Sequence, residues 1–186
     1  MVHELVLKVC GITREIDAYN AVNSGANIIG VVRAQNSPRF TKSSFVENLK
    51  SSGYQVAGVY NDKNYLIHGF SGEDFIQIHY DHEPEEIQHV RNITGKRIIS
   101  VISFSKARNL MFDLKGYLKE ADFVLIEEKP KIIDRIAQID VHDKKIGVAG
   151  GIKSEDIPDI IRAGFDFIDL SSSLENFPGI KNYEKL

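Results

Sequence analysis

The segment LVLKVCGIT, residues 5–13, is the starting point for predicting the fold of the chain. Its apolar and β-branched residues form a run too short for a helix, and the run stops at the turn residue Gly11, so we predict a buried strand. Alternation places Val6, Lys8 and Cys10 on one face of this strand. A thiol at the carboxyl end of a strand lies where α/β folds place chemistry, although a lone cysteine is also commonly an inert buried residue.

Seven further short apolar runs follow, and the eight runs begin at a nearly regular spacing. Counting the first at residues 5–10, the others are 27–32, 56–60, 75–79, 97–102, 123–127, 146–149 and 167–170. The stretches between them carry helix-terminus signals: Thr13 or Ser154 before, Pro84 at a first turn and glycine after. The clearest predicted helices cover residues 15–24, 85–93 and 155–163.

A repeated strand–helix order predicts parallel strands joined by right-handed crossovers. We therefore expect an α/β fold, a minimal (β/α)8 TIM barrel that forms a single domain over residues 1–186. Residues 62–70 leave room for only two helical turns in the third unit, and the eighth helix is nearly absent. An open doubly wound sheet is the alternative, but it rarely needs eight evenly spaced strands.

Composition excludes several classes of function. The chain has 186 residues, 42% hydrophobic and 26% charged, with a net charge of −3, so no electrostatic footprint for nucleic acid or anionic membrane is present. No apolar stretch reaches a membrane span and the start lacks a signal peptide. One cysteine and six histidines without metal-ligand spacing indicate no disulfide and no metal. We expect a cytoplasmic protein without a cofactor.

Two loops after the seventh and eighth strands are candidates for a phosphate site. Gly150 and Gly151 lie between a strand and a helix, where bare backbone N–H groups can approach an anion, although a glycine pair is equally typical of a tight turn. Ser171, Ser172 and Ser173 add hydroxyl groups in the next loop. Barrels often bind phosphate between these two loops, which favours a site over simple helix capping.

The same residues carry a resemblance to a known family. The segments are KVCGIT (8–13), GVV (30–32), SPRF (37–40), GVYN (58–61), IQIH (76–79), AGG (149–151), DLSS (169–172) and FPGIK (177–181). In this order they resemble phosphoribosylanthranilate isomerase of tryptophan biosynthesis, over nearly the whole chain. The resemblance implies a cofactor-free (β/α)8 barrel that converts N-(5′-phosphoribosyl)anthranilate to 1-(o-carboxyphenylamino)-1-deoxyribulose 5-phosphate by an Amadori rearrangement. Its partner would be this phosphorylated small molecule, bound by a monomer or homodimer.

The resemblance also implies roles for individual residues. Cys10 matches the family's catalytic base, and Glu127 stands where the family has an aspartate as the acid. Arg39 matches the arginine that meets the anthranilate carboxylate, while His79 and Asp169 fall at substrate-contact positions. Lys8 is a cation that would lower the thiol pKa, or else the partner of a carboxylate such as Asp169 or Glu127. Burial of Glu127 is expected to raise its pKa, as an acid requires.

Several departures from the family pattern leave alternatives open. Glu127 is one methylene longer than aspartate, Tyr80 and Ser173 each stand in place of a glycine, and the glycine-rich loop after strand six is replaced by residues 129–131. Glu128 could share the acid role, although alternation points it away from the barrel axis. Another sugar-phosphate isomerase or epimerase, or a non-catalytic paralogue that binds a phosphorylated ligand, are the rival functions.

Overall fold

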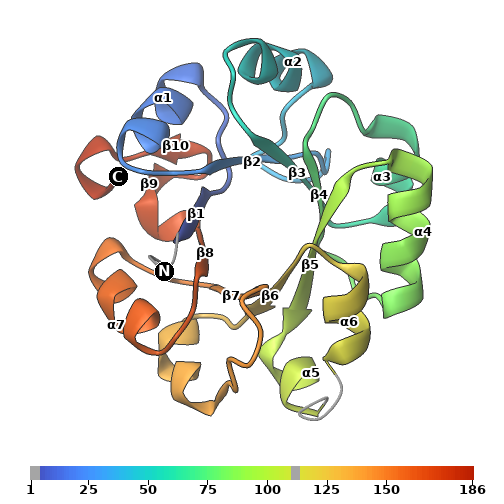
Figure 1. Ribbon diagram of the computed structural model, residues 1–186. Helices are drawn as coiled ribbons and strands as arrows, with labels where there is room; N and C mark the ends of the chain where they lie inside the picture. The colour runs from blue at the N-terminus through green and yellow to red at the C-terminus, as the bar shows by residue number, and fades with distance from the viewer. Residues whose placement is uncertain (1–4, 110–113) are drawn as a thin grey trace.

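A computed structural model of the chain describes residues 5–109 and 114–186. Eight parallel strands pair in chain order, and the first pairs with the eighth, so the sheet closes into a barrel (Figure 1). The strands are β1 (Val6–Val9), β2 (Ile28–Val32), β3 (Val56–Tyr60), β4 (Phe75–Ile78), β5 (Arg97–Ser103), β6 (Phe123–Glu127), β7 (Ile146–Ala149) and β8 (Phe167–Leu170). The predicted barrel is confirmed, and each predicted strand end lies within one residue of the observed one.

Helices surround the closed sheet, as Figure 1 shows. They are α1 (Glu15–Asn23), α2 (Ser43–Ser51), α3 (Lys63–Gly69), α4 (Pro84–Thr94), α5 (Phe104–Asn109), α6 (Lys115–Glu120) and α7 (Ile157–Arg162), with the short 3-10 turns η1 (Ile132–Asp134), η2 (Ile136–Gln138) and η3 (Ser154–Asp156). The third helix is short, as predicted. Within the described part of the chain, no helix combines the length and apolar character that crossing a bilayer requires.

Two predicted helix caps are wrong. Thr13 does not cap α1; its hydroxyl donates instead to the carbonyl of Gly179, 2.5 Å away. Ser154 likewise donates to the Lys185 carbonyl, and the N-cap residue of the turn η3 that precedes α7 is Lys153. Both hydroxyl groups bind the carboxyl-terminal segment, a partner that local sequence cannot reveal.

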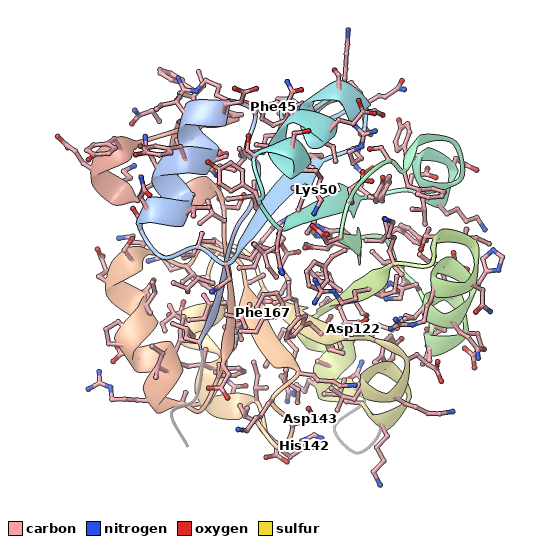
Figure 2. All side chains as sticks on the ribbon, turned by 45° about the horizontal axis from the view of Figure 1, so that its top comes forward. Phe45, Lys50, Asp122, His142, Asp143 and Phe167 are labelled. Carbon is pink, nitrogen blue, oxygen red and sulfur yellow. The ribbon has the colours of Figure 1, made fainter. Side chains whose placement is uncertain are left out.

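Inside the barrel, the apolar side chains lie away from the carboxyl ends of the strands. Three rings stack across it: Phe123 lies 4.5 Å from Phe167 and 6.1 Å from Phe75, between ring centroids. Figure 2 shows Phe167 near the centre of the molecule. Small apolar side chains from neighbouring strands complete this inner cluster, which includes Ile28, Ala57, Ile99, Val101 and Leu125. The polar inward-facing residues therefore collect above it, at the carboxyl ends of the strands.

A hairpin takes the place of an eighth helix. After η4 (Ser172–Leu174), β9 (Glu175–Phe177) pairs antiparallel with β10 (Ile180–Lys181), and the chain continues into η5 (Tyr183–Lys185). The hairpin lies beside α1 in Figure 1, and the backbone N–H of Lys181 donates to Asp17 of α1 over 3.3 Å. This packing places Glu175 and Lys181 at the rim of the barrel.

Candidate active site

One cavity of about 730 Å³ opens at the carboxyl ends of the strands. Nine of the ten predicted site residues line it: Cys10, Arg39, His79, Glu127, Gly150, Gly151, Asp169, Ser171 and Ser172. Ser173 does not line it, because its hydroxyl donates to the carbonyl of Ile152 and it faces a neighbouring cavity. The strand order thus brings together residues that lie up to 162 positions apart in the sequence, from Cys10 to Ser172.

Cys10 and Lys8 lie on the inner face at the end of β1. A Cβ atom on Gly30 of β2 would lie 2.8 Å from Lys8 Nζ and 2.9 Å from Cys10 Sγ, so this glycine gives both groups their space. Lys8 is fully buried and its Nζ donates to Asp169 Oδ2 over 2.8 Å. Of the two roles predicted for Lys8, pairing with Asp169 is confirmed.

The surroundings of Cys10 favour the neutral thiol in the free protein. Burial raises the pKa of Cys10, and the nearby charges of Lys8 and Lys181 offset only part of that increase. Burial alone would lower the pKa of Lys8, but Asp169 and Cys10 outweigh it and raise the pKa, which keeps the lysine charged. Lys8 does lower the thiol pKa, as predicted, but burial outweighs its effect, so the pKa of Cys10 in the free protein stays above its ordinary value.

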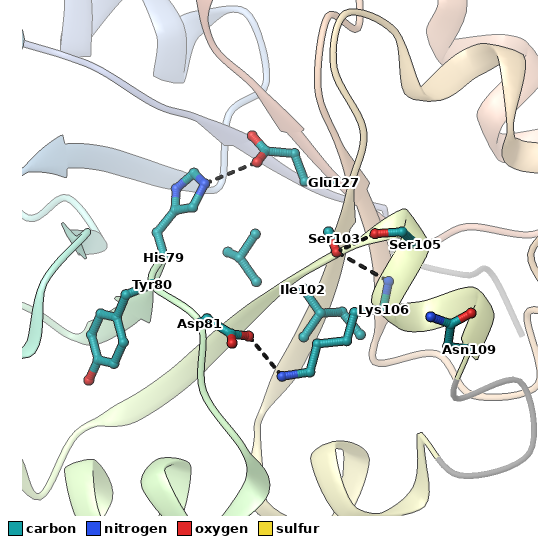
Figure 3. Close-up of a pocket in the computed structure, with 10 residues that line it drawn as sticks. His79, Tyr80, Asp81, Ile102, Ser103, Ser105, Lys106, Asn109 and Glu127 are labelled. Carbon is teal, nitrogen blue, oxygen red and sulfur yellow. Dashed lines mark hydrogen bonds and ion pairs between the residues drawn. The ribbon is translucent and has the colours of Figure 1, made fainter.

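Glu127 ends β6 and faces the cavity, where it contacts His79 from the end of β4. His79 Nε2 lies 3.0 Å from Glu127 Oε2, and Lys129 Nζ lies 3.6 Å from Oε1 of the same carboxylate. The contact between His79 and Glu127 is marked by a dashed line in Figure 3. Burial raises the pKa of Glu127, but the hydrogen bond from His79 and the charge of Lys129 outweigh it, so the pKa is lowered. The predicted rise in this pKa is wrong.

Glu128 is turned away from this cavity. It lines a separate groove that also includes Phe104 and Arg135. The alternation along β6 therefore places Glu127, and not its neighbour, in the candidate acid position, as predicted.

Arg39 reaches the cavity from the loop after β2 and is held by a carboxylate. Its Nε and Nη2 donate to Glu175 over 2.9 and 2.5 Å, and Glu175 also pairs with Lys181 at 3.1 Å. Lys181 Nζ donates further to the carbonyl of Cys10, over 2.6 Å. A Cβ on Gly11 would approach Arg39 Cδ to 2.8 Å, so the glycine after the thiol makes room for this arginine.

The glycine pair packs closely against the segment after β6, where residues 129–131 replace the expected glycine-rich loop. Gly150 and Gly151 have φ values of +107° and +62°, a region that favours glycine. A Cβ atom at these positions would lie 2.1 Å from the carbonyl oxygen of Glu128 and 1.9 Å from that of Pro130. The backbone of this segment therefore lies directly against the predicted phosphate loop.

A second cavity of about 590 Å³ shares His79 and Glu127 with the first (Figure 3). Lys106 lines it and is bound to two carboxylates, Asp81 at 2.9 Å and Glu83 at 2.8 Å. The positive charge of Lys106 is therefore already neutralised by these two carboxylates.

Residues 5–109 and 114–186 contain no group of three or more histidine, cysteine, aspartate or glutamate side chains placed to hold a metal ion. The ionisable groups that line the main cavity are the Cys10 thiol, the His79–Glu127 pair, the Asp169 carboxylate and two cations, Arg39 and Lys129. Such groups can move protons and bind anions.

Four contributing residues were not predicted as site residues: Gln77, Lys129, Glu175 and Lys181. Gln77 could have been found, because alternation along β4 places it on the same inner face as His79. Lys181 could also have been found, because it ends the segment FPGIK (177–181) of the family resemblance. Glu175 carried no comparable signal.

A thiol and a carboxylate lie at the mouth of a (β/α)8 barrel, beside a glycine loop and an arginine, and such a site can move protons and bind an anionic substrate. The model of the N-(5′-phosphoribosyl)anthranilate (PRA) isomerase family matches residues 7–186. The chain belongs to this family.

Individual relatives agree with that membership. The N-(5′-phosphoribosyl)anthranilate isomerase of Thermoplasma volcanium is 40% identical over 180 residues, which cover 97% of this chain and 91% of the relative. The phosphoribosyl anthranilate isomerase structure from Thermus thermophilus superposes with a TM-score of 0.77 at 23% identity and covers 97% of this chain and 94% of that one. A structure of monomers generated from the dimeric Thermotoga maritima enzyme gives 0.71 at 21%, with the same coverage.

Proposed function

We propose that this protein isomerises N-(5′-phosphoribosyl)anthranilate to 1-(o-carboxyphenylamino)-1-deoxyribulose 5-phosphate in tryptophan biosynthesis, with Cys10 as base and Glu127 as acid. The observation that carries this proposal is that a thiol from β1 and a carboxylate from β6 line one cavity together with Arg39 and the glycine loop. Family membership across residues 7–186 supplies the reaction.

Ring opening is the acid step. Protonation of the furanose oxygen breaks its bond to C1′, and the nitrogen lone pair forms the iminium ion. Glu127 is ionised in the free protein and accepts a hydrogen bond from His79, so the reactive form is the one in which the Cys10 thiol has lost its proton and Glu127 carries one. Glu127 gives this proton to the furanose oxygen, and the proton that Cys10 takes from C2′ restores the resting site.

Cys10 performs the base step. Its thiolate removes the proton from C2′, the electrons of that bond form the enolamine, and tautomerisation gives the ketone. The thiol is neutral in the free protein, so the reactive thiolate forms with the help of Lys8 and Lys181, whose charges both lower the thiol pKa.

Anion contacts hold the two ends of the substrate. Arg39 is a planar donor suited to a carboxylate, and Glu175 fixes it through Nε and Nη2, which leaves Nη1 outside that pair for the anthranilate carboxylate. The backbone at Gly150 and Gly151, with Ser171 and Ser172, would hold the phosphate. Ser173 is a weaker candidate because its hydroxyl already binds Ile152.

The proposal also covers the oligomeric state and the cellular location of the enzyme. One Thermotoga relative is described as dimeric, and we propose a cytoplasmic monomer or homodimer for this chain. Light scattering of the purified protein distinguishes these two states.

Turnover of the proposed substrate is the test. Anthranilate and ribose 5-phosphate condense to the substrate, whose conversion by purified protein is followed by chromatography against a protein-free control. Catalysed formation of the ketose product supports the function. Activity toward simple pentose phosphates alone would favour another sugar-phosphate isomerase, and tight binding of a product analogue without conversion would favour a non-catalytic paralogue.

A further inference from the structure

Two buried oxygen atoms at the floor of the main cavity have no hydrogen-bond donor within the described chain. They are Gln77 Oε1 and Asp169 Oδ1. Gln77 is 2% exposed and Asp169 is 6% exposed, and both residues line the cavity. A buried acceptor without a donor is destabilising, so this pair is suited to a ligand that brings its own O–H groups.

The neighbouring contacts fix which atoms stay unpaired. Lys8 Nζ donates to Asp169 Oδ2 over 2.8 Å, and Gln77 Nε2 lies 3.5 Å from the same oxygen. If the Gln77 amide were reversed, its oxygen would face this carboxylate, which is repulsive. The two remaining acceptors are therefore Gln77 Oε1 and Asp169 Oδ1.

We infer that these two oxygens accept hydrogen bonds from the cis 2′- and 3′-hydroxyl groups of the substrate's ribose, and that Gln77 is a specificity-determining residue. This inference rests on the proposed function. Asp169 pairs in register with Lys8, which shares a strand face with Cys10, so Asp169 lies on the side where C2′ is deprotonated and binds the 2′-hydroxyl. Gln77 comes from β4 across the barrel and binds the 3′-hydroxyl.

A deoxy substrate tests the assignment, because the 3′-hydroxyl does not react. Two substrates are made from anthranilate with ribose 5-phosphate or with 3-deoxyribose 5-phosphate. We expect wild-type kcat/KM to fall roughly 10- to 100-fold for the 3-deoxy substrate, since a site that binds a hydroxyl is left unpaired without it. Gln77→Met should lose activity with the full substrate and treat the two substrates nearly alike.

Stability provides a second readout. Methionine removes the unpaired acceptor, so the denaturant midpoint of Gln77→Met should equal or exceed that of the wild type. Gln88→Met, the same change on the exposed face of α4, is the matched control and should keep the wild-type discrimination.

The outcomes separate the inference from the proposed function. If wild-type protein converts both substrates equally well, or if Gln77→Met keeps the discrimination, the assignment of Gln77 is wrong while the isomerase function stands. If wild-type protein converts neither substrate, both the assignment of Gln77 and the proposed isomerase function are wrong.

Discussion

At the scale of single residues, the proposed reaction depends on the protonation states of Cys10 and Glu127. Free protein holds a neutral thiol and an ionised carboxylate, whereas the reaction needs the opposite arrangement. The two arrangements contain the same number of protons, so the reactive one is a less populated form of the same site. The positions of both residues could be predicted from the sequence, but these states could not, because they depend on His79, Lys129 and burial.

The state of the thiol can be measured directly, because Cys10 is the only cysteine. We predict that its alkylation by iodoacetamide is slow at neutral pH and reaches half its maximal rate above pH 9.0, the ordinary thiol value, since burial raises its pKa. Unfolded protein should instead react as an ordinary thiol. A rate that already levels off near neutral pH would contradict this account.

The choice between the two adjacent glutamates gives a second prediction. Glu127→Gln keeps the shape of the side chain but cannot supply a proton, so kcat should fall by roughly 10²- to 10⁴-fold. Glu128→Gln, which lies outside the cavity, is the control and should retain wild-type turnover. The reverse result would assign the acid role to Glu128.

At the scale of elements, the eight-fold repeat explains why the strands could be predicted so closely. Each strand is a short apolar run between turn residues, and this signal is local. The caps at Thr13 and Ser154 failed because each hydroxyl binds a carbonyl of the carboxyl-terminal segment, more than 30 positions away in sequence. The hairpin of β9 and β10 was not predicted either, because the strand–helix repeat indicated a very short eighth helix at this position.

The contact between the glycine loop and the segment after β6 gives an element-scale prediction. Gly151→Ala would place a Cβ 1.9 Å from the Pro130 carbonyl, so the segment must move and KM for the phosphorylated substrate should rise, by on the order of tenfold or more. Gly95→Ala is a matched control, since Gly95 has a similar φ of +66° and a Cβ there meets nothing within 4 Å. Its KM should be unchanged although it carries a similar backbone strain. Equal effects on KM would refute a role for this contact.

At the scale of the whole molecule, buried charges hold the carboxyl-terminal hairpin against the barrel. Glu175 is bound by Arg39 from the loop after β2 and by Lys181 of β10, so it joins distant parts of the chain. Burial raises the pKa of Glu175, but these two cations outweigh it and the pKa is lowered. A lowered carboxylate pKa contributes stability that is present above the ordinary value of 4.5 and is lost as the pH falls through the folded-state value.

Removal of this charge should therefore reduce stability in a pH-dependent way. Glu175→Gln leaves two cations without their carboxylate, and we expect a loss of about 3–5 kcal/mol in the free energy of unfolding at pH 6. This difference should shrink as the pH falls from 4.5 toward the folded-state value, because the unfolded wild-type chain then binds a proton that its folded state does not. Urea unfolding followed by far- and near-ultraviolet circular dichroism measures both, with the exposed Glu184→Gln as control. A difference independent of pH would contradict the linkage, and two separate transitions would contradict our proposal that residues 1–186 form one domain.

The central claim is that the Cys10 thiol removes the C2′ proton of the substrate, and release of deuterium from C2′ tests it most directly. The substrate is made from anthranilate and 2-deuterated ribose 5-phosphate, and deuterium appearing in water is measured for wild type and for Cys10→Ala. We predict a loss of about 10²- to 10⁴-fold in the release rate for Cys10→Ala, while its affinity for a reduced product analogue stays close to that of the wild type. Release at the wild-type rate by Cys10→Ala would show that another group is the base.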